Sequence, residues 1–452
     1  MIRLIFVFVF LLGSLALLAD NKASVSGSDM KVIEETPEAN TGLNRIFVVY
    51  DTNGCSLKYN ASNGYTALVK RYSNLGGGYA EEVNNVDREA SSISIPLSGD
   101  DMGYIIEDNG TAYYCWIVNY RNHYFHINEV SPDETPDCSY SVLNISGSGS
   151  QITFYTINGQ PRPLSRDIHL YYTTQEFDKD RLEFVTTDLV KVYESLNSVL
   201  SISPPAYCAS SFTIVGDRFL EAWGLQEEKE SVVVEPVAVD CFTEAIQDEY
   251  DGEEGSNITT SDSSGLGGSA PATIQFNSYV TDAVVHYEWQ MSSNQDFENP
   301  EYRFYQQNLQ YIFDQEGVFY LRFIGSNNDG SCETVGDVFT ISIGASVLEC
   351  PNAFSPNGDG VNDIWKVSYR SLTDFHCEIF NRNGQRIYGF DNPSDGWDGK
   401  WHGKTVKSGV YYYVITATGA DGKKYKKSGD INIINSLNYG NGGSAPVYPD
   451  EE

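Results

Sequence analysis

Short runs of apolar and aromatic residues recur along this 452-residue chain, and in some of them, such as Ser92–Ile95, apolar and polar residues alternate strictly. Runs such as Arg45–Tyr50 and Gly317–Phe323 are rich in Val, Ile, Phe and Tyr, and turn-forming pairs such as Asn63-Gly64 separate the runs. Alternation with a period of two, bounded by Gly and Asn, is typical of half-buried β-strands. Strand signals that recur about every ten residues are typical of β-sandwiches. The pattern therefore predicts an all-β chain of tandem β-sandwich modules.

The first two modules are predicted at 43–137 and 138–245. One segment of the second module, 187–200, departs from the alternating pattern. Its apolar residues recur at roughly helical spacing: Leu189, Val190, Val192, Leu196 and Leu200. This spacing predicts one short helix in the second module.

Three further segments lack the apolar periodicity that a buried core requires. Residues 20–42 are polar and are predicted to form a flexible leader. Residues 246–268 are acidic and then rich in Ser and Gly, which predicts a flexible linker between modules. Residues 436–452 form an acidic, Gly-rich tail.

The N-terminus has the order of a secretory signal peptide. Arg3 precedes the apolar run Leu4–Leu12, and small residues such as Ala16 and Ala19 follow it. We predict a signal peptide at 1–19. A membrane anchor is the alternative, but the run is shorter than the roughly 20 residues that a helical span needs. With no second stretch of that kind in the sequence, we expect no membrane span once the signal is removed.

The charge balance also points to export. The formal net charge is −33, from 62 acidic and 29 basic residues. A surface this acidic argues against a nucleic-acid partner, because binding phosphates requires concentrated Lys and Arg. In an exported protein, the eight cysteines are candidates for disulfides.

The segment 269–346 forms a compact third module. Tyr287-x-Trp289, the run Gly317–Phe323 and a closing strand at Val338–Ile343 resemble a PKD-type or related immunoglobulin-like β-sandwich. The resemblance implies a spacer or an interaction surface. The fold class that we predict is accordingly a series of immunoglobulin-like β-sandwiches.

The last module, 347–435, carries several ordered motifs. They are the turn-rich opening at 351–363, Asn381-Arg382 with Gly384, the sequence Gly396–Gly399, and the strand that begins at Gly409. Their candidate functional residues are Pro351, Asn352, Phe354, Pro356, Asn357, Gly358, Asp359, Gly360, Asn362, Asp363, Asn381, Arg382, Gly384, Gly396, Trp397, Asp398, Gly399, Gly409 and Tyr411.

Together these motifs resemble the gliding-motility-associated C-terminal domain, the type B sorting domain of type IX secretion in Bacteroidetes. The resemblance implies that type IX machinery in the outer membrane recognises the folded domain and directs the chain to the cell surface or the medium. Two features depart from the family: Asn383 stands where Trp is common, and residues 436–452 follow the last expected strand.

One disulfide is predicted within this module. Cys350 opens one strand, and Cys377 lies in the next clear strand, 375–380, which we expect to pair with the first. The other connectivities stay open.

The turn-rich opening also invites a calcium interpretation through Asn357, Asp359 and Asp363, whose oxygens suit a hard cation. Aligned on an EF-hand loop, however, Lys366 would stand in the place of the bidentate Glu. An EF-hand is therefore excluded, and we favour a turn held by its Asn and Asp side chains over a metal site.

No motif of an enzyme emerges. His123 and His126, three residues apart in a predicted strand, would point to opposite faces and not to one metal ion. The chain has no Gly-x-Ser-x-Gly, His-Glu-x-x-His or P-loop sequence. We expect no catalytic residues and no cofactor.

The sequence thus favours a non-enzymatic exported protein whose β modules serve adhesion or binding of a still unknown surface ligand. Its expected partner is the type IX secretion machinery. Two alternatives stay open: a secreted carbohydrate-active hydrolase with its site in 43–245, and a structural component of a gliding or secretion assembly.

Overall fold

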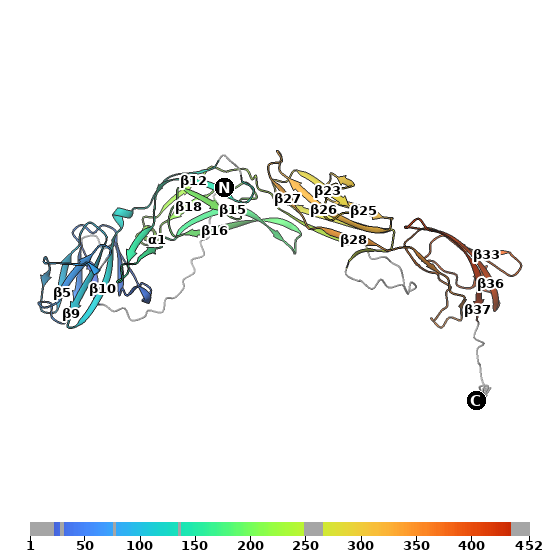
Figure 1. The fold of residues 1–452 in the computed structure, drawn as a ribbon, viewed down its shortest axis with the longest axis horizontal. Helices are drawn as coiled ribbons and strands as arrows, with labels where there is room; N and C mark the ends of the chain where they lie inside the picture. The colour runs from blue at the N-terminus through green and yellow to red at the C-terminus, as the bar shows by residue number, and fades with distance from the viewer. Residues whose placement is uncertain (1–21, 28–30, 76–77, 134–136, 248–264, 435–452) are drawn as a thin grey trace, which may run out of the picture. The chain divides into compact units, whose positions relative to one another are not determined.

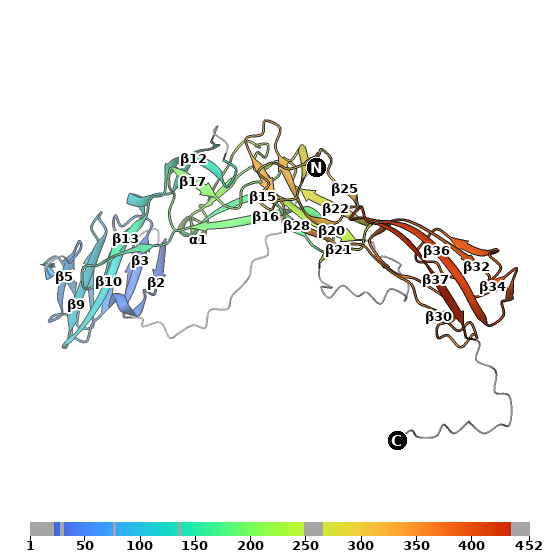
Figure 2. The same cartoon turned by 45° about the vertical axis from the view of Figure 1, so that its right-hand side comes forward.

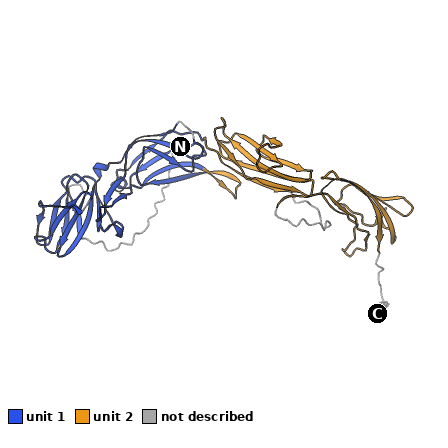
Figure 3. Ribbon diagram, viewed as in Figure 1, with its two compact units in different colours: residues 1–174, 186–236 blue, residues 175–185, 237–452 orange. Residues whose placement is uncertain are grey.

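The computed structural model describes residues 22–27, 31–75, 78–133, 137–247 and 265–434. The chain divides into two compact units, coloured in Figure 3: residues 1–174 with 186–236, and residues 175–185 with 237–452. The regular secondary structure of the described residues is almost entirely β-strand, as Figure 1 shows, which confirms the prediction of an all-β chain of tandem sandwiches.

The first sandwich consists of two sheets. In one sheet the order is β1 (Ala23–Ser26), β4 (Ser56–Asn60), β8 (Ser92–Pro96) and β7 (Asp87–Arg88). In the other it is β2 (Val32–Glu35), β3 (Arg45–Val49), β10 (Thr111–Asn119), β9 (Met102–Asp108), β5 (Leu68–Tyr72) and β6 (Glu81–Glu82). Two 3₁₀ turns, η1 (Ala39–Thr41) and η3 (Tyr120–His123), lie outside these strands.

Strand β3, which lies between β2 and β10 in the larger sheet, is buried on both faces. Ile46, Phe47, Val48 and Val49 are all at most 2% exposed, and β3 pairs in parallel with β10. An uninterrupted apolar run is what a strand covered on both faces requires. Phe47 and Val49 pack in the core of the first sandwich. Ile46 and Val48 pack in a second core, which they share with residues of the second module.

The second module therefore packs on the first within one unit. Its strands form three sheets: β11 (His126–Pro132), β12 (Ser141–Ser148) and β17 (Val199–Ile202); β13 (Ile152–Tyr155) and β14 (Pro161–Leu164); and β16 (Glu183–Tyr193), β15 (Ile168–Asp178), β18 (Thr213–Gly216) and β19 (Glu227–Glu230). A single helical turn, α1 (Arg218–Ala222), follows β18.

The prediction of a helix at 187–200 is wrong. Residues up to Tyr193 belong to strand β16, whose exposure alternates with a period of two. Val190 and Val192 are exposed, while Leu189 and Lys191, which alternate with them, are half-buried. β-Branched residues favour a strand over a helix, and only five apolar positions supported the helical spacing. The short helix of this module lies instead at α1, where the Asp217 side chain accepts a hydrogen bond from Leu220 N.

The prediction of a flexible leader at 20–42 is also wrong for part of this segment, which contains two strands. Strand β1 pairs with β4, and β2 pairs with β3. Ala23 and Val25 are 7% and 6% exposed, so β1 does bury an apolar face. A four-residue strand has only two inward positions, too few for its alternation to stand out from the polar residues around it.

The third module is a sandwich that begins before its predicted start at 269. One sheet has the order β20 (Cys241–Gln247), β22 (Ala272–Val280) and β25 (Leu309–Phe313). The other has β21 (Leu266–Gly268), β28 (Phe339–Ile343), β26 (Gly317–Ser326), β23 (His286–Ser292) and β24 (Tyr302–Phe304), with β27 (Glu333–Val335) paired to β26. Strands β20 and β21 thus occupy both ends of the predicted linker 246–268, whose middle, 248–264, lies outside the described residues.

The final module is built on a five-stranded sheet. Its order is β30 (Ala353–Phe354), β37 (Lys424–Ile433), β36 (Gly409–Gly419), β32 (Leu372–Phe380) and β33 (Arg386–Phe390). The long strands β32, β36 and β37 lie side by side in Figure 2. Two short ribbons complete the module: β29 (Val347–Glu349) with β31 (Ser368–Arg370), and β34 (Lys400–Trp401) with β35 (Lys404–Thr405).

Two of the predicted segments lie at the ends of the sequence. The signal peptide at 1–19 and the acidic tail at 436–452 lie outside the described residues. Within the described part of the chain, no helix is both long and apolar enough to span a membrane.

Candidate recognition site

Two buried tryptophans in the final module bring its predicted motifs together. Trp365 and Trp397 are both 0% exposed and bond to each other through their backbones, with N–O distances of 2.9 and 3.0 Å. Phe354 of the opening motif packs on Trp397 at 5.5 Å between ring centroids. Tyr411 of the β36 motif packs edge-on against the same indole at 5.3 Å. Residues from three motifs therefore meet at one aromatic core.

The glycine of the third motif allows the opening motif to approach closely. Gly399 has φ of +71°, and a Cβ atom there would lie 2.8 Å from Pro356 Cγ. Both the left-handed backbone and the contact favour glycine. The neighbouring Asp398 holds the turn, because its Oδ1 accepts a hydrogen bond from Lys400 N at 3.0 Å.

The opening loop is a turn whose acidic groups bind its own backbone. The Asp363 carboxylate accepts hydrogen bonds from the amides of Asn357, Gly358 and Gly360 at 2.6–2.8 Å. These bonds from the Gly358 and Gly360 amides hold the pKa of Asp363 below its usual value. Asp359 Oδ1 accepts a further bond from Val361 N at 2.8 Å. The carboxylates weighed as calcium ligands thus satisfy the loop itself, as the Asx-turn interpretation requires.

The other opening residues have backbone roles. Pro351 O accepts a hydrogen bond from Trp365 Nε1 at 2.7 Å, and Asn352 O accepts one from Asn432 N at 2.8 Å. Asn362 adopts a left-handed φ of +52°. In a different part of the module, Gly384 takes φ of +74° in the β32–β33 turn.

The predicted disulfide between Cys350 and Cys377 is absent, since both residues are free thiols. The strand pairing on which the prediction rested is not formed either: β30, which follows Cys350, pairs with β37, and both β37 and β36 lie between β30 and β32. Burial, followed by the neighbouring Cys350, raises the pKa of Cys377 to about 12. Cys377 is therefore a protonated thiol at neutral pH.

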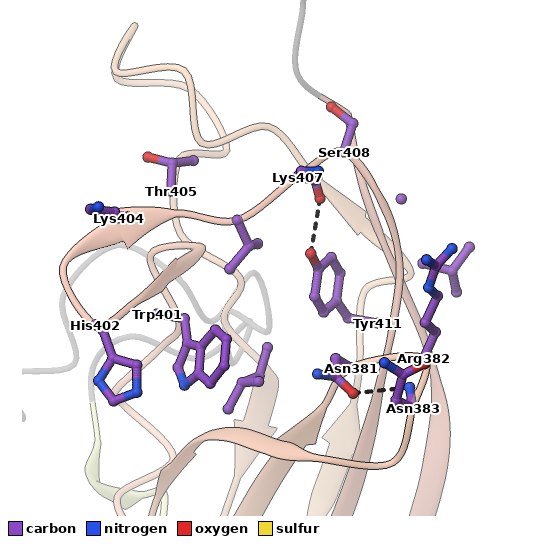
Figure 4. Close-up of a pocket in the computed structure, with 14 residues that line it drawn as sticks. Asn381, Arg382, Asn383, Trp401, His402, Lys404, Thr405, Lys407, Ser408 and Tyr411 are labelled. Atoms are coloured by element: carbon purple, nitrogen blue, oxygen red, sulfur yellow. Dashed lines mark hydrogen bonds between the residues drawn. The ribbon is translucent and has the colours of Figure 1, made fainter.

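A second group of motif residues opens onto a cavity of about 600 Å³, drawn in Figure 4. The β32–β33 turn, the β34–β35 ribbon and the start of β36 form its walls. Its lining consists of Asn381, Arg382, Asn383, Ile387, Trp401, His402, Lys404, Thr405, Val406, Lys407, Ser408, Gly409, Val410 and Tyr411. We call this cavity the basic pocket.

The basic pocket combines an aromatic and apolar floor with a basic rim. Trp401 and Tyr411 are half-buried, while Arg382, Lys404 and Lys407 are exposed. Tyr411 Oη donates a hydrogen bond to Lys407 O at 3.0 Å and so fixes its ring beside this rim. Burial raises the pKa of Tyr411, which keeps the phenol neutral.

The charge of the pocket contrasts with that of the chain. No Asp or Glu is among its lining residues, although acidic residues outnumber basic ones 62 to 29 in the chain. None of its three Lys and Arg side chains forms an ion pair with a described residue. The pocket can therefore bind an anionic group with unpaired cations, and its rings can stack on a planar or apolar part of the same ligand.

The motif prediction located this pocket only in part. Asn381, Arg382, Gly409 and Tyr411 line it, but the β34–β35 side was missed. A sequence signal existed there, because residues 400–407 contain three Lys, one His and one Trp and no acidic residue. In a chain this acidic, such a run is itself a local anomaly.

The two histidines considered as metal ligands, His123 and His126, have separate partners. His123 Nε2 lies 2.6 Å from Asp101 Oδ2, and His126 Nδ1 lies 3.0 Å from Glu227 Oε2. Across the described residues, no group of three or more His, Cys, Asp and Glu side chains could hold a metal ion.

Two parts of the chain match known domain families. Residues 129–231 match the fibronectin type III domain family, and residues 348–433 match the CHU_C type IX secretion signal domain. The final module belongs to this secretion signal family, as its motifs predicted. The chain is thus a protein exported by type IX secretion, to the cell surface or to the medium. The second module, to which the sequence motifs assigned no family, is of the fibronectin type III class.

Three solved structures show a weak similarity to this chain. A tetra-tandem repeat in the extending region of a large adhesion protein is 8% identical, with a TM-score of 0.21, and the match covers 86% of this chain and 97% of that one. Sidekick-1 immunoglobulin domains 1–5 are 12% identical, with a TM-score of 0.25, and the match covers 86% of this chain and 78% of that one. The fibronectin(III)-like modules of Clostridium thermocellum CbhA are 11% identical, with a TM-score of 0.17, over 41% of this chain and 98% of that one. No curated protein matches the chain.

Proposed function

We propose that the chain is a non-enzymatic surface protein whose β-sandwich modules make contact with an external ligand in adhesion. One observation carries the proposal: a type IX secretion signal domain at 348–433 follows a series of β-sandwiches that includes a fibronectin type III domain. Export supplies the location, and the sandwiches supply a series of loops and sheet faces for contact with a ligand.

The two acidic side chains buried in the first unit, Asp108 and Asp217, form hydrogen bonds within the fold. Asp217 is engaged by Arg166 Nη1 at 2.6 Å and caps α1. Asp108 accepts a hydrogen bond from Ser62 N at 2.7 Å. A glycosidase of the usual kind needs two carboxylates facing a cleft. The carboxylates of Asp108 and Asp217 bind other groups of the fold and give no support to the hydrolase alternative.

The secretion arm of the proposal is tested in cells that export the chain. Deletion of residues 347–452 is expected to abolish surface exposure and release, because it removes the whole signal domain. Protease treatment of intact cells, followed by detection of the first module, measures the exposure. Deletion of 435–452 alone is the matched control, since it leaves every described strand in place. Undiminished exposure after the larger deletion would refute the sorting role.

The adhesion arm requires a separate measurement. Cells that export the full chain are compared with cells that lack it for retention on abiotic surfaces and on polysaccharide-coated surfaces under flow. We expect retention to fall when the chain is absent. Equal retention on every surface, together with turnover of a polysaccharide by the purified chain, would favour the hydrolase over the adhesin.

A further inference from the structure

The basic pocket has a candidate occupant on the same chain. Strand β37 ends at Ile433, which pairs with Gly409, and Gly409 is itself a lining residue of the pocket. The chain that continues from β37 therefore starts beside the pocket. It continues for 18 residues, from Asn435 to Glu452.

The composition of that segment is complementary to the pocket. Its last six residues are Val-Tyr-Pro-Asp-Glu-Glu, and the segment 435–452 contains no Lys or Arg. Asp450, Glu451 and Glu452 provide carboxylates for the rim, and Tyr448 provides an aromatic ring for the floor. Guanidinium and ammonium groups pair with carboxylates, and aromatic rings stack favourably at such a floor.

The length of the segment is sufficient. An extended chain spans at most about 3.5 Å per residue, so roughly fifteen residues between Ile434 and Asp450 reach up to about 50 Å. The starting point beside Gly409 needs only a fraction of this reach, and the Gly-rich sequence 440–443 favours a reversal of direction. The short tether also gives an effective concentration on the order of 1 mM, at which a contact with a Kd well below that value is largely formed.

We propose that the basic pocket binds an acidic, tyrosine-containing peptide and that residues 447–452 of the same chain are its ligand. The contact places carboxylates against Arg382, Lys404 and Lys407 and the Tyr448 ring against Trp401 and Tyr411. It covers a surface at which two of the secretion-signal motifs meet. A partner that recognises this surface must displace the acidic segment first.

Zero-length carbodiimide cross-linking of the purified full chain tests this contact directly, because the reagent joins an amine to a carboxylate that touches it. We expect Lys404 and Lys407 to cross-link to Asp450, Glu451 or Glu452 with yields about tenfold above those of exposed lysines elsewhere on the module, because bound carboxylates stay in contact with the pocket lysines and meet the other lysines only in passing. Lys424 and Lys426 on β37 are the reference lysines, since both are exposed and neither lines the pocket. Raising the salt to 1 M should remove most of this preference, because the Debye length falls to about 3 Å.

A charge exchange distinguishes the contact from a damaged fold. The pair K404E/K407E should abolish the peptide contact. The control pair K424E/K426E makes the same change in charge outside the pocket and should retain the cross-links from Lys404 and Lys407. Adding D450K/E451K/E452K to K404E/K407E should restore cross-linking with the polarity reversed. Equal yields at pocket and reference lysines, no cross-link at all, or cross-links only in dimers would overturn the proposal. The readout needs neither secretion nor adhesion, so its failure leaves the proposed function untouched.

Discussion

A buried ion pair in the second module makes the sharpest test of how the first unit is held together. Arg166 and Asp217 are both 0% exposed, with Nη1 and Oδ2 2.6 Å apart. Asp217 also accepts hydrogen bonds from Tyr120 Oη at 2.9 Å and from Leu220 N at 3.1 Å. Arg166 Nε donates to Ser150 O at 2.8 Å. One carboxylate therefore neutralises a buried guanidinium, binds a tyrosine and caps a helix.

The substitution Asp217→Ala should destabilise the first unit by about 4 kcal/mol. Removing one partner of a buried ion pair costs about 3–5 kcal/mol, because the other charge is left uncompensated away from water. The lost helix cap contributes about 1 kcal/mol, but the two costs are not fully additive since they share one side chain. The double substitution R166M/D217L should cost less than D217A alone, because no buried charge is left without a partner.

Hydrogen exchange detected by mass spectrometry in a denaturant series measures this effect. Peptides from β15 and β18 report the opening of the first unit, and peptides from β36 and β37 report the second unit as an internal control. Arg121→Ala is the matched control, because Arg121 pairs with Asp51 at 2.5 Å but its side chain is 72% exposed; such a pair contributes less than about 1 kcal/mol. A cost below 1 kcal/mol for D217A, or a double variant less stable than D217A, would refute the reasoning.

Three further predictions concern pH, the Gly399 turn and thiol reactivity. Burial raises the pKa of Tyr72, Tyr104 and Tyr120. In each case the pKa in the folded state lies above the unfolded value of about 10. The contribution of these tyrosines to the free energy of unfolding is therefore constant below pH 10 and falls above it, by up to about 1.4 kcal/mol per pH unit for each tyrosine. Urea unfolding between pH 8 and 11 measures this fall, and a rise in stability over that range would contradict it. Gly399→Ala should destabilise the final module by about 1–3 kcal/mol, from its φ of +71° and the contact with Pro356; an unchanged unfolding midpoint for that module would contradict it. Cys377, with its pKa raised to about 12, should react with iodoacetamide at pH 8 at least about 1,000-fold more slowly in the folded chain than in urea; comparable rates would show that the thiol is accessible and ionised.

Most of the strands could be predicted from the sequence, because their signal is local. Arg45–Val49 shows why: a continuous apolar run between turn residues already indicates a strand buried on both faces. What its second face packs on was not predictable, since that core is completed by residues such as Leu170 and Ile214, more than a hundred positions away.

The errors at 187–200 and at Cys350 have the same origin. In both places the local pattern allowed two structures, and strand pairing decided between them: β16 pairs with its hairpin neighbour β15, and β30 pairs with the distant β37. Strand β16 joins the sheet through β15, which suits its β-branched residues in a strand. Strand β30 joins β37 in parallel, a non-local pairing that separates it from the strand of Cys377. Sequence neighbours suggested an antiparallel pair instead, because adjacent strands often pair.

The motif residues of the secretion signal domain fall into two physical groups. Trp397, Gly399 and Asp363 are explained by the fold: an indole with no exposed surface, a backbone with positive φ and a carboxylate bonded to three amides. Arg382 has no such explanation. It is exposed and forms no ion pair with a described residue, yet it stands in a motif at the rim of a cavity without acidic groups. A charge that the fold does not use is available to a ligand, so the substitution Arg382→Ala should leave the unfolding midpoint of the module unchanged while weakening the contact with residues 447–452.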